Sequence, residues 1–224
     1  MKPSIRQCLK LSGSAAMILW LSAGTAATNS NFYLDFAEKT AAWLMAKAVA
    51  SAGGAFSWPT ADEQSYSRSG MDQGTAGIGT FFLELYKMTE KGVYLSYAEG
   101  AGKSLGAHSY QDGEIDWISG AAGEGCFLID LWQVAKNGYY LNEARRAADW
   151  LIAKHYEDRG GYHWKHYPDY TKIFTGFAHG ASGIGYFFAR LYKETGDARY
   201  LDCAKKAAVW VNSYSWEPGP NLYC

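Results

Sequence analysis

Two residues in this sequence have types and positions suited to proton transfer. His179 stands directly before the glycine that opens the stretch Gly180-Ala-Ser-Gly183, and Asp116 stands four residues before the first glycine of a matching stretch at 120–123. Histidine exchanges protons near neutral pH, which makes it the commonest general acid or base. Both residues also have structural interpretations: a histidine here can cap a helix, and an aspartate before a glycine-rich turn commonly accepts backbone hydrogen bonds.

Other titratable residues lie near the same stretches. Glu124 replaces an isoleucine found in two sister stretches, and a glutamate near a helix N-terminus is favourable in itself. Asp72 precedes its glycine by only two residues, so it does not share the register of Asp116. His163 and His166 are three residues apart without a cysteine or carboxylate beside them, and we therefore expect no metal site there.

These residues belong to a repeat. Segments 74–86, 120–132 and 180–192 align without gaps, and the Tyr-Leu pairs at 94–95, 140–141 and 200–201 keep the same spacing. In the third copy, apolar residues from Ile184 to Tyr192 follow helical spacing, and a turn at 194–197 leads to a second helix over about 198–212. Gly196 suits a left-handed C-terminal position and Asp197 an N-cap. On the second helix we expect Tyr200, Ala204, Ala207 and Val211 to be buried.

Each copy is therefore an αα-hairpin. The first helix of the chain matches the second helix of a hairpin, the one at 140–151. The sequence therefore contains about three and a half hairpins. Such hairpins stack into an open solenoid or a closed α/α toroid. The glycine-rich starts of the first helices favour the toroid, where their N-termini converge on one rim. Gln73, Ser119 and His179 then occupy equivalent rim positions, near N–H groups that favour a thiolate or an enolate oxygen.

Together these motifs resemble the lanthionine synthetase C-like family. The resemblance rests on the repeated GxAGxGxFxxxLY pattern, on Asp116-Trp-Ile-Ser-Gly120 and on Gly176-Phe-Ala-His179-Gly180, and it covers residue 32 to the end. It implies an all-α fold in which αα-hairpins form part of a six- or seven-hairpin toroid. It also implies zinc-dependent addition of a cysteine thiol to a dehydroamino acid of a peptide, with His179 and Asp116 in the acid/base steps.

The zinc ligands that the resemblance implies are largely missing from this chain. The family holds zinc with a Cys-x-Gly and a Cys-His-Gly unit, and neither is complete here. Extrapolating the repeat places Cys224 two residues before the next expected glycine, which makes it one candidate ligand. Cys126 and Cys203 are better interpreted as small buried residues. We therefore expect the chain to be an N-terminal portion of a longer toroid, and residues 28–224 alone to bind little or no zinc.

The N-terminus and the charge indicate an exported protein. Residues 1–27 have the basic, apolar and small-residue regions of a secretory signal peptide, which leaves a toroid domain over 28–224 in a secreted or periplasmic protein. Cleavage removes three basic and no acidic side chains, so the formal net charge falls from −1 to −4. We expect no nucleic-acid partner, no membrane span after cleavage, a peptide or small-molecule substrate, and self-association through the open end of the repeat.

Two other functions fit the sequence. An exported glycoside hydrolase or lyase on an α/α toroid would use two carboxylates, which Asp116 with Glu124 or Asp72 could supply, and tryptophan and tyrosine platforms for sugars. A non-catalytic helical-repeat scaffold would bind a partner through loops such as 161–168 and 56–58. Aromatic clusters in loops, however, are more often local packing.

Overall fold

The helical repeat expected from the sequence is present in the structure. The computed structural model describes residues 29–58, 69–112 and 114–214; residues 1–27 and Cys224 therefore lie outside the described residues. None of the described helices is long and apolar enough to cross a membrane. The α-helices of the described residues are α1 (Asn29–Lys47), α2 (Thr75–Thr89), α3 (Gly92–Gly106), α4 (Ala121–Ala135), α5 (Gly138–Ala153), α6 (Ala181–Thr195) and α7 (Ala198–Asn212).

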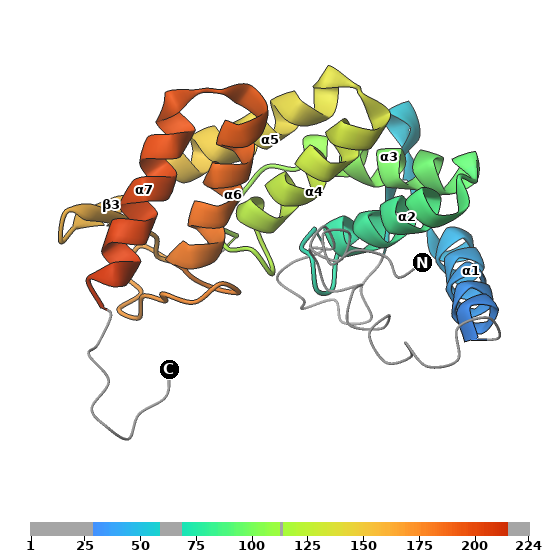
Figure 1. The fold of residues 1–224 in the computed structure, drawn as a ribbon, viewed down its shortest axis with the longest axis horizontal. Coiled ribbons are helices and arrows are strands. Elements are labelled where there is room, and N and C mark those ends of the chain that lie inside the picture. Colours follow the sequence, from blue (N-terminus) through green and yellow to red (C-terminus); the bar gives the residue numbers. More distant parts are fainter. Residues whose placement is uncertain (1–28, 59–68, 113, 215–224) are drawn as a thin grey trace, which may run out of the picture.

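The helices form three antiparallel hairpins, α2/α3, α4/α5 and α6/α7, preceded by the single helix α1 (Figure 1). The first helices of the hairpins pack side by side in the order α2, α4, α6, so the hairpins follow one another along an arc. This arrangement confirms the expected all-α fold of toroid type.

Two small β-hairpins interrupt the helical pattern. Strands β1 (Val49–Ser51) and β2 (Ala55–Ser57), joined by a 3₁₀ turn at Ala52–Gly54, connect α1 to α2. Strands β3 (Tyr156–Asp158) and β4 (Gly161–His163) connect α5 to α6.

The tryptophan that follows each β-hairpin is buried. The indole nitrogens of Trp58 and Trp164 each donate a hydrogen bond of 2.8 Å to a backbone carbonyl, that of Leu44 and that of Leu151. These two rings therefore fix the hairpins to the preceding helices. Local packing therefore explains the two tryptophans. The scaffold hypothesis would need these rings to contact a partner, and neither ring is free to do so.

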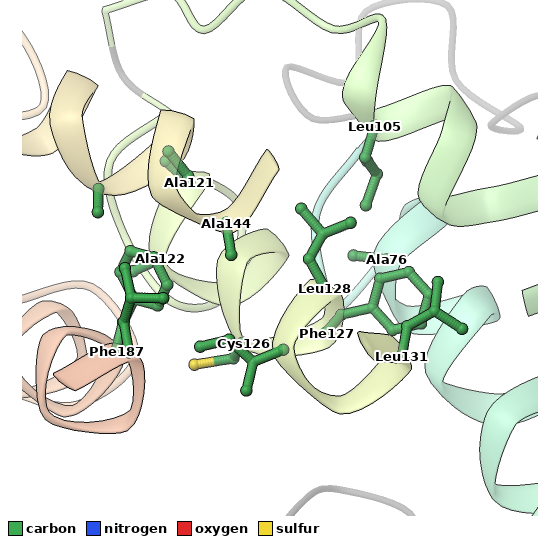
Figure 2. Close-up of a cluster of buried hydrophobic side chains, with 14 of the residues drawn as sticks. Ala76, Leu105, Ala121, Ala122, Cys126, Phe127, Leu128, Leu131, Ala144 and Phe187 are labelled. Atoms are coloured by element: carbon green, nitrogen blue, oxygen red, sulfur yellow. The ribbon is translucent and has the colours of Figure 1, made fainter. Parts of the chain in front are cut away.

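Glycines let the first helices of successive hairpins approach closely. A Cβ atom on Gly79 of α2 would overlap the ring of Phe127 of α4, and one on Gly125 of α4 would overlap the ring of Phe187 of α6. Phe127 and Phe187 lie in one continuous core that also contains Cys126 (Figure 2). Each phenylalanine thus fills the space that a missing side chain leaves on the preceding module. The repeated glycine and phenylalanine positions in the sequence encode this stacking.

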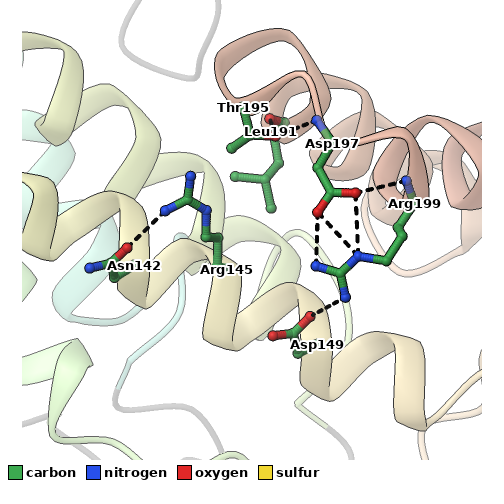
Figure 3. A network of polar contacts seen from close by, with 7 residues as sticks. All are labelled: Asn142, Arg145, Asp149, Leu191, Thr195, Asp197 and Arg199. Atoms are coloured by element: carbon green, nitrogen blue, oxygen red, sulfur yellow. Dashed lines mark hydrogen bonds and ion pairs between the residues drawn. The ribbon is translucent and has the colours of Figure 1, made fainter.

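The turn between α6 and α7 has the expected caps. Gly196 is left-handed with φ 69°, and the Asp197 side chain accepts a hydrogen bond of 3.0 Å from the backbone nitrogen of Arg199. The Arg199 guanidinium also pairs with Asp197 and with Asp149 of α5 (Figure 3). The helix α7 has the expected bounds, 198–212. Its buried face is Tyr200, Cys203, Ala207 and Trp210, whereas Ala204 and Val211 are only half-buried.

Candidate functional site

The three loops that open α2, α4 and α6 lie next to one another along one edge of the arc (Figure 1). The backbone nitrogen of Met71 donates to the carbonyl of Ile118 at 2.8 Å, and the nitrogen of Ile118 donates to the carbonyl of Ala178 at 3.2 Å. We call this edge, residues 69–74, 114–120 and 174–180, the rim. It brings together residues more than 100 positions apart in the sequence.

A glycine in the first turn of each helix lets its loop fold back onto the helix. A Cβ atom on Gly123 would lie closer than 3.0 Å to the carbonyl oxygen of Trp117, a separation that real Cβ atoms do not show. The same close approach recurs between Gly77 and Met71 and between Gly183 and Phe177. The motif glycines therefore set the position of the rim loops relative to the helices.

Asp116 and His179 meet on this rim. The Asp116 side chain has 0% exposure, and its Oδ1 accepts hydrogen bonds from the backbone nitrogen of Ser119 at 2.7 Å and from the Ser119 hydroxyl at 2.9 Å. Its Oδ2 accepts from Nδ1 of His179 at 2.8 Å. The structural interpretation of Asp116 is confirmed, because it accepts a backbone hydrogen bond within its own turn. The same carboxylate also faces the histidine of the next module.

The His179 ring extends from this buried carboxylate toward solvent. Its side chain is 53% exposed. Because Nδ1 donates to Asp116, Nε2 is the nitrogen available to a substrate. A carboxylate on Nδ1 holds the ring in one tautomer and one orientation. The pair thus joins a fully buried carboxylate to an imidazole that reaches solvent.

His166 is a third member that the sequence did not indicate. Its Nε2 donates to the carbonyl oxygen of His179 at 3.1 Å and lies 3.7 Å from Oδ2 of Asp116. We expected no carboxylate beside His166, and this expectation was wrong, because a residue 50 positions earlier is folded against it. The only signal was that His166 precedes His179 by 13 residues, in the loop leading to the same helix.

The cysteines of the described residues do not resemble zinc ligands. Cys126 and Cys203 are buried in the core, and burial raises the pKa of the Cys126 thiol to about 12 and that of the Cys203 thiol to about 11. Zinc binds the thiolate form, which these environments disfavour. The thiolate set of the family is thus not supplied by the described residues. Asp116, His166 and His179 do place three potential ligand atoms within 4.8 Å of one another.

We expect Cys126 and Cys203 to resist alkylation in the folded protein, because each thiol is buried and its pKa is raised. Treatment with iodoacetamide at pH 8, followed by peptide mapping, should find both unmodified. Both should be modified once the chain is unfolded in guanidinium. Rapid labelling of Cys126 without denaturant would show that the α4 face is open.

Glu124 lies in the first turn of α4 and is fully buried. Among the described residues neither of its carboxylate oxygens makes a hydrogen bond of good geometry, although the hydroxyls of Ser69 and Tyr110 lie close enough to interact with the carboxyl. Burial raises the pKa of Glu124 to about 7, and the Ser69 hydroxyl and His108 oppose this rise. The simple view of Glu124 as a favourable charge at a helix N-terminus therefore missed the desolvation of this carboxyl.

We expect Glu124 to make stability depend on pH. Its folded pKa of about 7 exceeds its ordinary value of 4.5, so the folded state holds the proton more tightly. Its contribution is fully present below pH 4.5 and is lost as the pH rises through 7, a difference of about 3 kcal/mol.

The measurement is urea unfolding of the parent chain, Glu124→Gln and Glu124→Ile at pH 4.5 and pH 8. Glutamine keeps the shape without the ionisation, and isoleucine restores the residue of the sister copies. For both variants, the free energy of unfolding relative to that of the parent should be higher at pH 8 than at pH 4.5. An identical pH dependence in parent and glutamine variant would contradict a buried titrating carboxyl.

The three carboxylates considered for sugar hydrolysis do not form an exposed pair. Asp116 and Glu124 are fully buried, and Asp72 alone of the three faces solvent. A glycosidase requires two carboxyl groups that both reach the glycosidic bond. In this structure the three carboxylates therefore do not supply such a pair.

The fold and the rim together define a helical-hairpin protein of α/α toroid type. Its imidazole–carboxylate pair lies where the first helices of the hairpins begin. The sequence profile of the lanthionine synthetase C-like family matches residues 103–219, which is more than half of the chain. The chain belongs to this family. No curated protein matches it.

One similar solved structure is a family 76 glycoside hydrolase from a bovine Bacteroides thetaiotaomicron strain, an α/α toroid. It aligns with a TM-score of 0.57 and 19% identity, over 85% of this chain and 44% of the hydrolase chain. This chain thus spans less than half the length of that structure. At this identity the likeness shows the fold alone.

Proposed function

We propose that the rim is the acid/base site of a thiol addition to dehydroamino acids, which forms thioethers in a peptide. The observation that carries the proposal is the 2.8 Å hydrogen bond between the buried Asp116 carboxylate and Nδ1 of the exposed His179 ring. Membership of the lanthionine synthetase C-like family supports it, because both residues occupy the motif positions that the resemblance assigns to acid/base steps.

The addition needs a proton at one carbon. The thiol releases its proton to water, and its sulfur forms a bond to the β-carbon of the dehydroamino acid. The electron pair of the double bond then moves to the α-carbon and its carbonyl as an enolate. The enolate then takes a proton at the α-carbon, so that S–H has added across the double bond with no atom left over. His179 delivers this proton from Nε2, and Asp116 holds the ring in position for the transfer.

Zinc is part of the proposed reaction but not of the steps derived for these residues. When bound, zinc lowers the pKa of the substrate thiol. We propose Cys224 as one ligand of a separate thiolate site that the described residues do not complete; Cys224 itself lies outside the described residues. We also propose that the protein is exported by the signal-like segment 1–27 and acts in the periplasm or outside the cell.

The test is a thiol-consumption assay on the full chain. A synthetic peptide with one cysteine and one dehydrobutyrine is incubated with the protein, once without zinc and once with one equivalent of zinc, and free thiols are then capped with N-ethylmaleimide. Ring closure does not change the peptide mass, but it prevents capping, so mass spectrometry should show loss of the capped species. An unchanged capped fraction over many hours, relative to peptide alone, would refute the proposal.

The carbohydrate alternative is tested in parallel. The same preparation is incubated with α- and β-linked oligosaccharides, and new reducing ends are measured. We expect none above background. Reducing ends that appear with the parent chain and disappear with Asp72→Asn would favour a glycoside hydrolase, because Asp72 is the exposed carboxylate of the three.

A further inference from the structure

We infer that Asp116, His166 and His179 form a three-ligand site for a divalent transition metal of the zinc class. The site uses one carboxylate oxygen and two imidazole nitrogens from the rim loops that precede α4 and α6. It differs from the thiolate site that the family resemblance implies, and it does not depend on thiol addition being the function.

The distances suit a shared ion. Oδ2 of Asp116 lies 2.8 Å from Nδ1 of His179 and 3.7 Å from Nε2 of His166. Zinc bonds to nitrogen and oxygen are about 2.0–2.1 Å, so neighbouring ligands of a tetrahedral ion are about 3.3 Å apart. The first separation must open and the second must close by about half an ångström, and the two imidazole nitrogens, which lie within 4.8 Å of each other, must also approach that spacing. Without an ion, the 3.7 Å separation is too long for a hydrogen bond.

The surroundings of Asp116 orient it for this role. Ser119 occupies Oδ1 with two hydrogen bonds, which leaves Oδ2 directed at both rings. Such hydrogen bonds to the non-ligating oxygen are a usual support of metal-binding carboxylates. The carboxylate is fully buried and the His166 side chain is 16% exposed, whereas His179 is 53% exposed. The open side at His179 leaves room for water or substrate as a fourth ligand.

Protons and the ion compete for the same atoms. In the structure Nδ1 of His179 donates to Asp116 and Nε2 of His166 donates to a carbonyl, so both carry hydrogen. Each ring can instead hold its hydrogen on the other nitrogen, which frees the ligating atom. The hydrogen-bonded pair and the metal-bound cluster are therefore alternative states, and acid should weaken metal binding.

The test measures cobalt binding directly. The full chain is stripped with chelator, dialysed and titrated with Co²⁺ at pH 7.5, and the visible absorption of low-coordinate cobalt is recorded. We expect one equivalent to bind without a thiolate-to-cobalt charge-transfer band. His166→Gln should weaken binding by at least about 100-fold, since it removes a ligand rather than a supporting hydrogen bond.

Matched variants separate the possible sites. His155→Gln changes a histidine outside the cluster, and Cys224→Ser removes the sequence-predicted thiolate; both should bind cobalt like the parent. Circular dichroism and the melting temperature check that His166→Gln is folded. No stoichiometric cobalt, cobalt retained by His166→Gln, or cobalt lost in Cys224→Ser would each overturn the inference. None of these results depends on thiol addition, which the thiol-consumption assay tests separately.

Discussion

Replacing His179 by glutamine is expected to lower the rate of thiol addition about 10²- to 10⁴-fold, the range usual for loss of a general acid or base. Glutamine can still approach the Asp116 carboxylate through its amide, so the rim should remain folded. It cannot release a proton, however, so protonation of the enolate must rely on water. The measurement is the initial rate of capped-thiol loss at saturating peptide, which isolates the chemical step from binding.

Two further variants show whether the loss of rate comes from disrupting the Asp116–His179 pair. Asp116→Asn should also lower the rate, because the ring loses the carboxylate that fixes its tautomer and orientation. Asp72→Asn changes an exposed rim carboxylate that contacts neither residue of the pair, and it should retain the parental rate within about twofold. If His179→Gln reacts at the parental rate, the proton must come from another group and the proposed role of the pair fails.

Replacing Gly123 by alanine is expected to destabilise the protein by about 3 kcal/mol or more, and to disturb Asp116. The added Cβ atom would overlap the carbonyl oxygen of Trp117, and it would also lie 2.7 Å from the side chain of Met71. The carbonyl is fixed backbone, so the loop over 116–119 must move away from the first turn of α4. An added atom that can be accommodated only by moving the backbone is among the most destabilising kinds of substitution.

The matched control is Gly138→Ala. Gly138 is the first residue of α5, and nothing lies within 4 Å of the position of its Cβ atom. Alanine there should leave stability unchanged or raise it by about 0.4–1 kcal/mol, because the unfolded chain loses freedom. Urea unfolding monitored by circular dichroism compares the two variants with the parent. Equal stability of the two alanine variants would show that the close loop-to-helix contact does not constrain the rim.

Much of the fold was determined by the sequence. The three copies of the glycine and phenylalanine pattern predicted the hairpins, and α7 has the bounds expected from its spacing, 198–212. Gly196 and Asp197 took their expected conformations at the preceding turn. These features could be predicted because each depends on residues a few positions apart, where helical periodicity and capping chemistry leave a direct record. The β-hairpins did not follow from that periodicity, because their strands are only three residues long.

The site was determined by the sequence only in part. The motif positions of Asp116 and His179 singled them out as candidates, but the hydrogen bond between them joins two modules 63 residues apart. His166 and Glu124 were misjudged for the same reason. His166 acquires its carboxylate, and Glu124 loses its solvent, from loops of other modules packed beside them. The apolar contacts between first helices follow the repeated glycine and phenylalanine positions, but the polar contacts between loops of neighbouring modules leave no periodic trace in the sequence. Only the stacking of the hairpins therefore decided which side chains share the rim and which are desolvated.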